Sequence, residues 1–458
     1  MVFRRRTTPL SLRNWPRWAW AVATAILVAL LTLLGGGKSI TAAYKSFTET
    51  DRIIEISAAL SGAAKNSVPV TLIKVDDETM LRWGGPPITP HAALARLIEA
   101  AEKGGASAIV VDIDLAPENA AQPADPTLMS VIAGARTAVL PLMFVRSFRA
   151  GSLDADQPER GPTIVNPTPY DDVLAQSGNA MWVSVLTPLS ADRIVRRFRL
   201  WQTVCDGAQG VSYPSPALVV AARLDAAGDR SGDLRKFLAA QVDRRCKRMG
   251  AEPVSWPHRT SSDVAIQYMF NADTEEATAK TLAYRGANVA VFKQIPAWAL
   301  VSFDGNTATA VGEIDPQAFQ DRVVVIGVTH ANSHDVYATP LGTQPGVVIL
   351  ANTVAAASVM ADMPEASPLT EIVIAVLIFA VLAFISHYFH LAPAALMAGF
   401  ITLAAVLVLS RLFGFEAAVR VVAVTIALFV LHEFLGSLAG IIYDWAHGKG
   451  WRSMLKPH

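Results

Sequence analysis

The chain has 458 residues, of which 52% are hydrophobic and 17% carry a formal charge. Lysine and arginine together number 39, as do aspartate and glutamate, so the formal net charge at pH 7 is zero. Apart from the two ends, the basic residues do not gather on one segment. This excludes the concentrated positive surface that nucleic-acid-binding proteins use, and we expect no nucleic-acid partner.

The first apolar run covers residues 18–36 and is long enough to cross a bilayer, which takes about 20 helical residues. It follows a basic segment, residues 1–17, which the positive-inside rule places in the cytoplasm. A cleaved signal peptide is the competing interpretation. The length of the run and the lack of a small-x-small site after it favour an uncleaved anchor.

Three further apolar runs cover approximately residues 369–388, 391–412 and 417–443 and are joined by very short links. Together with the first run they predict an α-helical membrane bundle of four transmembrane helices within residues 18–36 and 369–443. Residues 444–458 would form a short cytoplasmic tail, consistent with its lysines and arginine. Both termini then lie in the cytoplasm and the central part lies outside it.

The central part begins with a predicted helical stalk over residues 37–60 and continues as an external domain over residues 61–365. Strands are predicted at 68–75, 108–113 and 322–326, and helices at 91–103 and 347–360, from their apolar patterns and Gly or Pro boundaries. Weaker strands are predicted at 137–145, 181–185, 194–201 and 264–270, and helices at 216–227 and 232–244. Alternation of strands and helices predicts an α/β fold with a mostly parallel open sheet flanked by helices. Residues 146–180 are expected to leave the sheet as a surface excursion.

Both cysteines of the chain, Cys205 and Cys246, fall in this external domain. An oxidising compartment permits them to pair, so we predict a disulfide between them. The sequence does not show that they are close in space.

Polar residues follow three of the predicted strands, at the edge where an open parallel sheet binds ligands. If these strands are neighbours, the polar residues converge on one crevice, which would suit a cation, a cationic ligand or an oligosaccharide. The alternative is that Asp77 and Asp114 cap helices or turns. The candidate ligand-binding residues are Asp76, Asp77, Asp112, Asp114, Thr329, His330, His334 and Asp335. We expect Asp112 and Asp114 to end the strand next to the one that Asp76 follows.

Metal binding and catalysis find little support. His330 and His334 have i,i+4 spacing, but their segment is rich in loop-forming residues and lacks the glutamate of an H-E-x-x-H site. No G-x-S-x-G nucleophile elbow is present. We therefore predict no metal, no cofactor and no enzymatic activity.

The last apolar run contains a polar position and two glycines on one helical face, at Glu433, Gly436 and Gly440. This small-xxx-small pattern predicts a close helix–helix contact. A proton-sensitive contact with a partner helix is the alternative, because a buried membrane carboxyl usually faces protein or water. Either interpretation predicts a homo- or hetero-oligomer.

Several blocks resemble the CHASE2 domain family, extracytoplasmic sensory modules of bacterial membrane receptors. They are LIKVDDETM, GASAIVVDIDL and RVVVIGVTHANSHDVYATPLGTQPGVVILANTV, in an order that places an anchor before them and three transmembrane helices after them. The resemblance covers nearly the whole chain. Asn352 lies in the last block where the family would lead us to expect a His-Ala pair. Many family members continue into a cyclase or kinase, whereas this sequence stops at His458.

The resemblance implies a multi-pass protein of the bacterial inner membrane with its large domain in the periplasm. That domain would bind an unknown extracytoplasmic ligand or a periplasmic protein. The signal would pass through the transmembrane helices to a separate output protein in the membrane or cytoplasm. The alternative is a structural or scaffold subunit of an envelope-spanning membrane complex.

Overall fold

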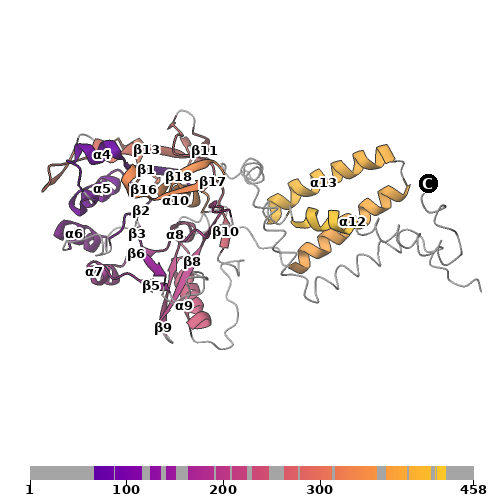
Figure 1. The fold of residues 1–458 in the computed structure, drawn as a ribbon, viewed down its shortest axis with the longest axis horizontal. Coiled ribbons are helices and arrows are strands. Elements are labelled where there is room, and N and C mark those ends of the chain that lie inside the picture. The colour runs from indigo at the N-terminus through magenta and orange to yellow at the C-terminus, as the bar shows by residue number, and fades with distance from the viewer. Residues whose placement is uncertain are drawn as a thin grey trace, which may run out of the picture. The chain divides into compact units, whose positions relative to one another are not determined.

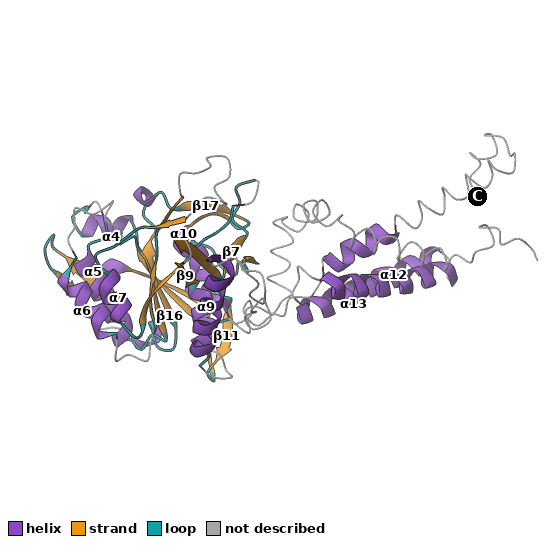
Figure 2. Ribbon diagram, turned by 90° about the horizontal axis from the view of Figure 1, so that it is seen from below, coloured by secondary structure: helices purple, strands orange, loops and turns teal. Residues whose placement is uncertain are grey.

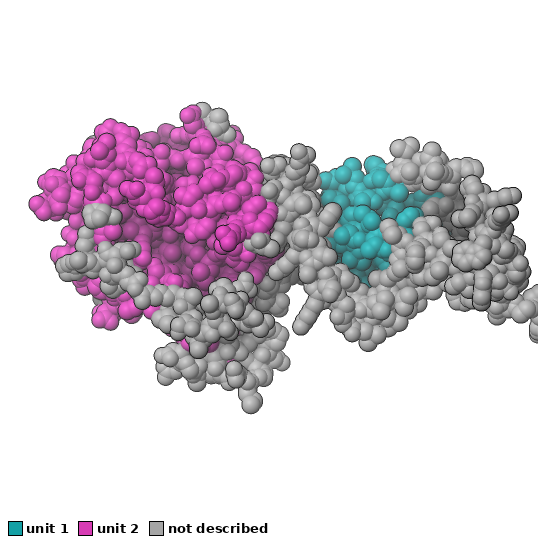
Figure 3. All heavy atoms as spheres, viewed as in Figure 1, with its two compact units in different colours: residues 1–50, 364–458 teal, residues 51–363 magenta. Residues whose placement is uncertain are grey.

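The fold was analysed in a computed structural model of the whole chain. The described residues are 67–86, 88–115, 124–135, 141–150, 163–189, 192–206, 209–223, 229–246, 263–276, 279–311, 315–357, 368–388, 391–413, 418 and 420–429. The predicted anchor at 18–36, the stalk at 37–60 and the face formed by Glu433, Gly436 and Gly440 lie outside these ranges. The chain divides into two compact units, residues 51–363 and residues 1–50 with 364–458 (Figure 3).

A six-stranded parallel sheet forms the centre of residues 51–363 (Figure 1). Its strand order is β13-β1-β16-β2-β3-β6, and every neighbouring pair is parallel. The strands are β1 (Val70–Val75), β2 (Ala108–Asp112), β3 (Leu142–Val145), β6 (Ala180–Val183), β13 (Phe292–Pro296) and β16 (Val323–Val328). The predicted α/β class with a parallel sheet flanked by helices is therefore confirmed.

Both faces of the sheet are buried. Along β1, Val70 and Leu72 belong to one apolar core, and Ile73 and Val75 belong to the other. Such strands must be apolar on both faces, which explains their continuous apolar runs. Helices α5 (His91–Lys103), α6 (Pro126–Gly134) and α7 (Asp171–Gln176) cover one face, and α10 (Gly346–Ala355) covers the other (Figure 2). Helix α8 (Pro216–Arg223) shares the apolar core of α10.

Arg322, directly before β16, bonds to β1 and to Ala290 at the amino end of the sheet. Its side chain is buried, with Nε donating to Thr71 Oγ1 at 2.7 Å, Nη1 to Ala290 O at 2.8 Å and Nη2 to Val70 O at 2.6 Å. Burial lowers the pKa of Arg322 to about 10. The fixed fork of donors suits several acceptors at once, so this arginine ties β1 and β16 to the residues that precede β13.

The order of the strands departs from one sequence-based expectation. We expected β2 to be the neighbour of β1, but β16 lies between them and pairs with both. In addition, β13 was not predicted, although it forms an edge of the sheet beside β1. Lys293 and Gln294 interrupt its apolar pattern, because an edge strand has polar surroundings.

Smaller elements surround the sheet. The predicted excursion over residues 146–180 contains a two-stranded ladder, β4 (Phe148–Ala150) with β5 (Thr163–Val165), and helix α7. The other short elements are α4 (Asp77–Arg82), β7 (Arg197–Arg199), β8 (Trp201–Asp206), β9 (Gln209–Pro214), α9 (Ser231–Cys246), β10 (Asp263–Ala265), β11 (Thr281–Tyr284), β12 (Ala287–Ala290), η6 (Ala297–Ala299), β14 (Val301–Phe303), β15 (Ala308–Ala310), η7 (Pro316–Ala318), η8 (Ala331–Ser333), β17 (Val336–Thr339) and β18 (Gly342–Pro345).

The two cysteines fall on elements that pack together. Cys205 lies on β8 and Cys246 is the last residue of α9, which packs against β8 and β9. The disulfide between them stays a prediction.

The second unit contains α12 (Pro368–Tyr388), α13 (Leu391–Phe413) and a helical segment over residues 420–429. Glu371 accepts from Arg420 Nε at 2.7 Å, and four residues further along α12 the carbonyl of Ala375 accepts from Thr425 Oγ1 at 3.4 Å. The contacts advance in the same direction on both segments, so α12 and residues 420–429 run parallel. Within the described ranges, no helix combines the length and the hydropathy that a bilayer crossing requires.

Candidate functional site

The chain changes sides of the sheet around β16. After β1 and after β2 it continues into α5 and α6 on one face, whereas after β16 it continues into α10 on the opposite face. A topological switch point therefore lies on each side of β16. Open parallel sheets bind ligands in the crevice beyond the carboxyl ends of the strands at such points.

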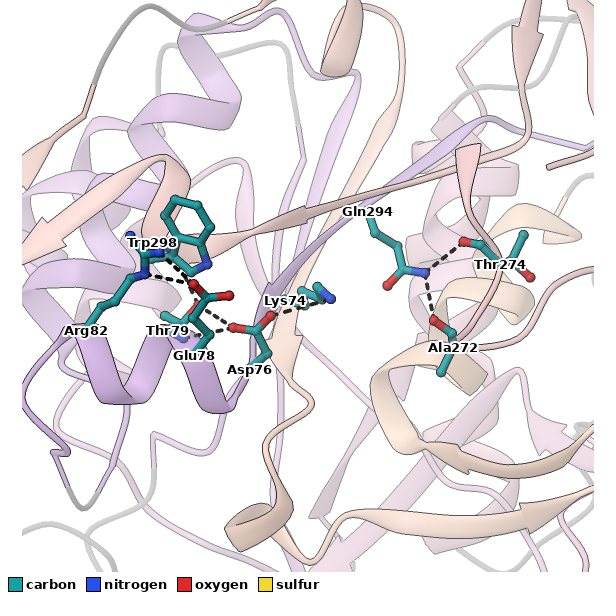
Figure 4. A network of polar contacts seen from close by, with 9 residues as sticks. All are labelled: Lys74, Asp76, Glu78, Thr79, Arg82, Ala272, Thr274, Gln294 and Trp298. Atoms are coloured by element: carbon teal, nitrogen blue, oxygen red, sulfur yellow. Dashed lines mark hydrogen bonds and ion pairs between the residues drawn. The ribbon is translucent and has the colours of Figure 1, made fainter. Parts of the chain in front are cut away.

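Asp76 follows β1 and has a structural role. Its Oδ1 accepts from Thr79 N at 2.9 Å and from Thr79 Oγ1 at 2.7 Å, which caps the start of α4. Its other oxygen lies 3.4 Å from Lys74 Nζ (Figure 4). Further along α4, the guanidinium of Arg82 lies 3.7 Å from the centre of the Trp298 ring. The capping alternative, which we had placed at Asp77 and Asp114, thus holds for Asp76.

Asp77 joins the loop after β1 to the loop after β16. This residue is exposed, and its Oδ1 accepts from the backbone N–H of Ala331 at 3.1 Å. Beside it, the N–H of Thr329 donates to the carbonyl of Val75 at 3.0 Å. The structure therefore brings Asp77 and Thr329 to the same side of the crevice.

Asp112 and Asp335 form an acidic pair on the other side of β16. Asp112 ends β2, and burial together with the nearby charge of Asp335 raises its pKa to about 7. Burial also raises the pKa of Asp335, although a hydrogen bond with the Tyr337 side chain opposes this shift. The pKa of Tyr337 is raised to about 12 by burial and by Asp335. Two carboxyls in such a setting favour a shared proton or a cation.

Asp335 lies at the beginning of α10. The N–H of Gly346, its first residue, donates to the backbone carbonyl of Asp335 at 2.9 Å. A Cβ atom at Gly346 would overlap the Asp335 carboxylate, so only glycine permits this close approach. An acidic side chain beside a helix N-terminus is favourably placed against the helix dipole.

The remaining predicted residues are spread around the crevice. His330 is buried, whereas His334 is exposed and has a left-handed backbone with φ of 53°. Asp114 lies further from β16 and accepts from Ser147 Oγ at 2.6 Å. In the described part of the chain, no group of three His, Cys, Asp or Glu side chains is arranged to hold a metal ion.

Two residues of the site were not identified from the sequence. Tyr337 lies on β17, and its contact with Asp335 depends on the hairpin that β17 forms with β18. Gly346 belongs to the PGV block, and a glycine directly before an apolar helix was the available signal.

These features define an α/β domain with polar residues at a switch point of its sheet, the usual place for ligand binding in open α/β folds. The family model of the CHASE2 domain matches residues 23–386, so the chain belongs to the CHASE2 domain family. CHASE2 is an extracellular-type sensory domain, which is consistent with a sensor role. No curated protein and no solved structure matches the chain.

Proposed function

We propose that this protein is a receptor of the bacterial inner membrane. Its CHASE2 domain binds an extracytoplasmic signal or a periplasmic partner at the crevice around β16. The bound state is relayed through membrane helices to a separate output protein. The protein itself has no catalytic activity in this proposal.

The pair of Asp112 and Asp335 is the observation that carries the proposed site. Asp112 ends β2, which pairs with β16, and Asp335 lies in the loop after β16; burial raises the pKa values of both. Buried groups with perturbed pKa values in a crevice are typical of functional sites. The ligand class that fits is a cation or a hydrogen-bond donor, because two carboxyls and the Tyr337 hydroxyl supply acceptors.

The surface of α12 supports membrane anchoring. Five large apolar side chains at three- or four-residue spacing are 47% to 64% exposed, and together they form one stripe along the helix. These residues are Leu369, Val373, Leu377, Val381 and Phe384. A stripe of this size is typical of a lipid or protein contact. The parallel course of α12 and residues 420–429 also agrees with three successive crossings, in which the first and third run in the same direction.

The proposed topology is tested by labelling intact cells with a membrane-impermeant maleimide. Leu81 is 78% exposed, so a Leu81→Cys variant presents a reactive thiol on the surface of the domain. The wild-type chain provides the baseline for its own two cysteines, and a Ser453→Cys variant provides the internal comparison. We expect labelling of Leu81→Cys alone. Labelling that requires permeabilised cells for Leu81→Cys would contradict a periplasmic domain.

The relay is tested by purifying the intact protein from its native membrane and identifying the proteins that accompany it. A co-purified cyclase, kinase or regulator supports the receptor. A stoichiometric structural complex without any signalling protein contradicts it and favours the scaffold alternative.

A further inference from the structure

Helix α10 contacts Asp335 at its first residue and Val68, near the start of the domain, at its last residue. Its first residue, Gly346, contacts Asp335. The carbonyl of its last residue, Ala355, accepts from the N–H of Val68 at 2.9 Å, directly before β1. Ten helical residues span roughly 15 Å.

The second contact joins two residues that lie, in sequence, towards the two ends of the unit of residues 51–363. The unit of residues 51–363 continues into the other unit before Asp51 and after Met363. Val68 is near the first of these boundaries in sequence, and Ala355 is near the second. The contact between Ala355 and Val68 therefore ties the last turn of α10 to the segment that leads into β1.

The interior of α10 is buried and bonded to the segment before β11. All residues from Val347 to Ala355 are buried. The Asn352 side chain is fully buried and uses its whole hydrogen-bonding capacity. Its Oδ1 accepts from the N–H groups of Met269 at 2.7 Å and Phe270 at 3.3 Å, and its Nδ2 donates to the carbonyls of Phe270 and Val348 at 3.0 Å each.

We propose that α10 is the element that transmits a change at the Asp335 carboxylate, against which Gly346 packs, to the contact between Ala355 and Val68. A ligand that binds the acidic pair in one position of α10 more tightly than in another shifts the balance between the two. The close approach of Gly346 to the Asp335 carboxylate makes the start of α10 sensitive to that change. The biological meaning rests on the proposed receptor function, but the coupling is a property of the domain.

The test is hydrogen exchange of the full-length protein in detergent, resolved to single amides. Gly346→Ala forces the start of α10 away from Asp335. We expect the Val68 amide to exchange about five-fold faster or more, a ratio that corresponds to ~1 kcal/mol. The Ile109 amide, which donates to Pro141 O within the sheet, is the reference and should not change. Faster exchange confined to the first turn of α10, or equal acceleration at Val68 and Ile109, would overturn the proposal.

Two further variants complete the design. Gly232→Ala is the matched control, because Gly232 also lies in the first turn of a helix and has open space around its Cβ position. It should leave Val68 exchange unchanged. Val68→Pro removes the donor to Ala355 and tests the reverse direction, since coupling between two sites is reciprocal. We expect faster exchange of the Gly346 amide. An unchanged Gly346 amide overturns the proposal, even where Gly346→Ala fails to fold.

The outcomes separate this inference from the receptor function. The exchange measurements use no ligand and no partner. Coupling without any co-purified signalling protein would leave the inference standing and count against the receptor. A co-purified signalling protein without coupling between Gly346 and Val68 would support the receptor function and exclude α10 as the relay.

Discussion

Substitution of Asp112 by asparagine tests whether ionisation of Asp112 lowers the stability of the folded protein. Asparagine keeps the size and shape of the side chain but does not ionise. The pKa of Asp112 rises from 3.8 to about 7 in the folded protein, first because of burial and second because of Asp335. A shift of about three pH units corresponds to ~4 kcal/mol between the two protonation states.

The sign of the pH dependence follows from proton uptake. Between the two pKa values, folded Asp112 holds a proton that the unfolded chain has already lost. Its contribution to stability is therefore complete below pH 3.8, decreases as the pH rises towards about 7, and stays constant above that value. The Asp112→Asn variant lacks this loss. The free energy of unfolding of the variant minus that of the wild-type protein should therefore increase by up to ~4 kcal/mol as the pH rises over this range.

The assay is urea unfolding of both proteins at a series of pH values, followed by the fluorescence of the buried Trp83 and Trp201. The informative quantity is the difference between the two free energies of unfolding at each pH. A difference that does not change between pH about 4 and about 8 would refute the reasoning. Asp114→Asn is the control. This neighbouring carboxyl is exposed and bonded to Ser147, and its variant retains Asp112, so it should keep the wild-type pH profile.

Three further substitutions test the supports of the fold by urea unfolding. Tyr170→Phe leaves His91 Nδ1 and the Asp125 N–H without the hydroxyl at 2.8 and 2.9 Å, which should cost about 1–3 kcal/mol. Because burial lowers the pKa of His91, the stability that depends on neutral His91 should fall as the pH drops below 6.5. Arg322→Lys replaces the planar guanidinium that donates to three acceptors, and should lower the free energy of unfolding by about 1–3 kcal/mol. Asn352→Ala leaves several buried backbone groups unpaired and should lower the free energy of unfolding by about 3 kcal/mol. A decrease below ~1 kcal/mol would contradict the conclusion that the Asn352 hydrogen bonds stabilise the domain.

The local parts of the fold were accessible from the sequence. The α5 helix was predicted over residues 91–103 and has those bounds. The cores of β1 and β16 were predicted because continuous apolar runs between turn residues are typical of strands buried on both faces. By contrast, the position of β16 between β1 and β2 is set by packing across the whole domain. Nothing in the local pattern of residues 322–326 encodes its neighbours.

The placement of some candidate residues at one edge was accessible for a similar reason. Parallel strands place their carboxyl ends at one edge, so polar residues after three strands were expected to converge there. The individual roles were not accessible. Asp76 and Asp77 are adjacent in sequence, yet Asp76 caps α4 while Asp77 reaches the loop after β16. That distinction depends on how α4 leaves the sheet, and the partner of Asp77 is 254 residues further along the chain.

In the proposed receptor, the position of β16 brings the candidate binding residues and α10 to neighbouring strands. Val70 of β1 pairs with Val323 of β16, so a late strand completes the sheet beside an early one. Strand β1 begins two residues after Val68. After β16, the chain continues through the β17–β18 hairpin into α10. A ligand between their carboxyl ends would therefore contact β1 and the segment that leads into α10. A ligand at the β3–β6 edge would have no such direct route, because the chain passes from β6 through many further elements before it reaches β16.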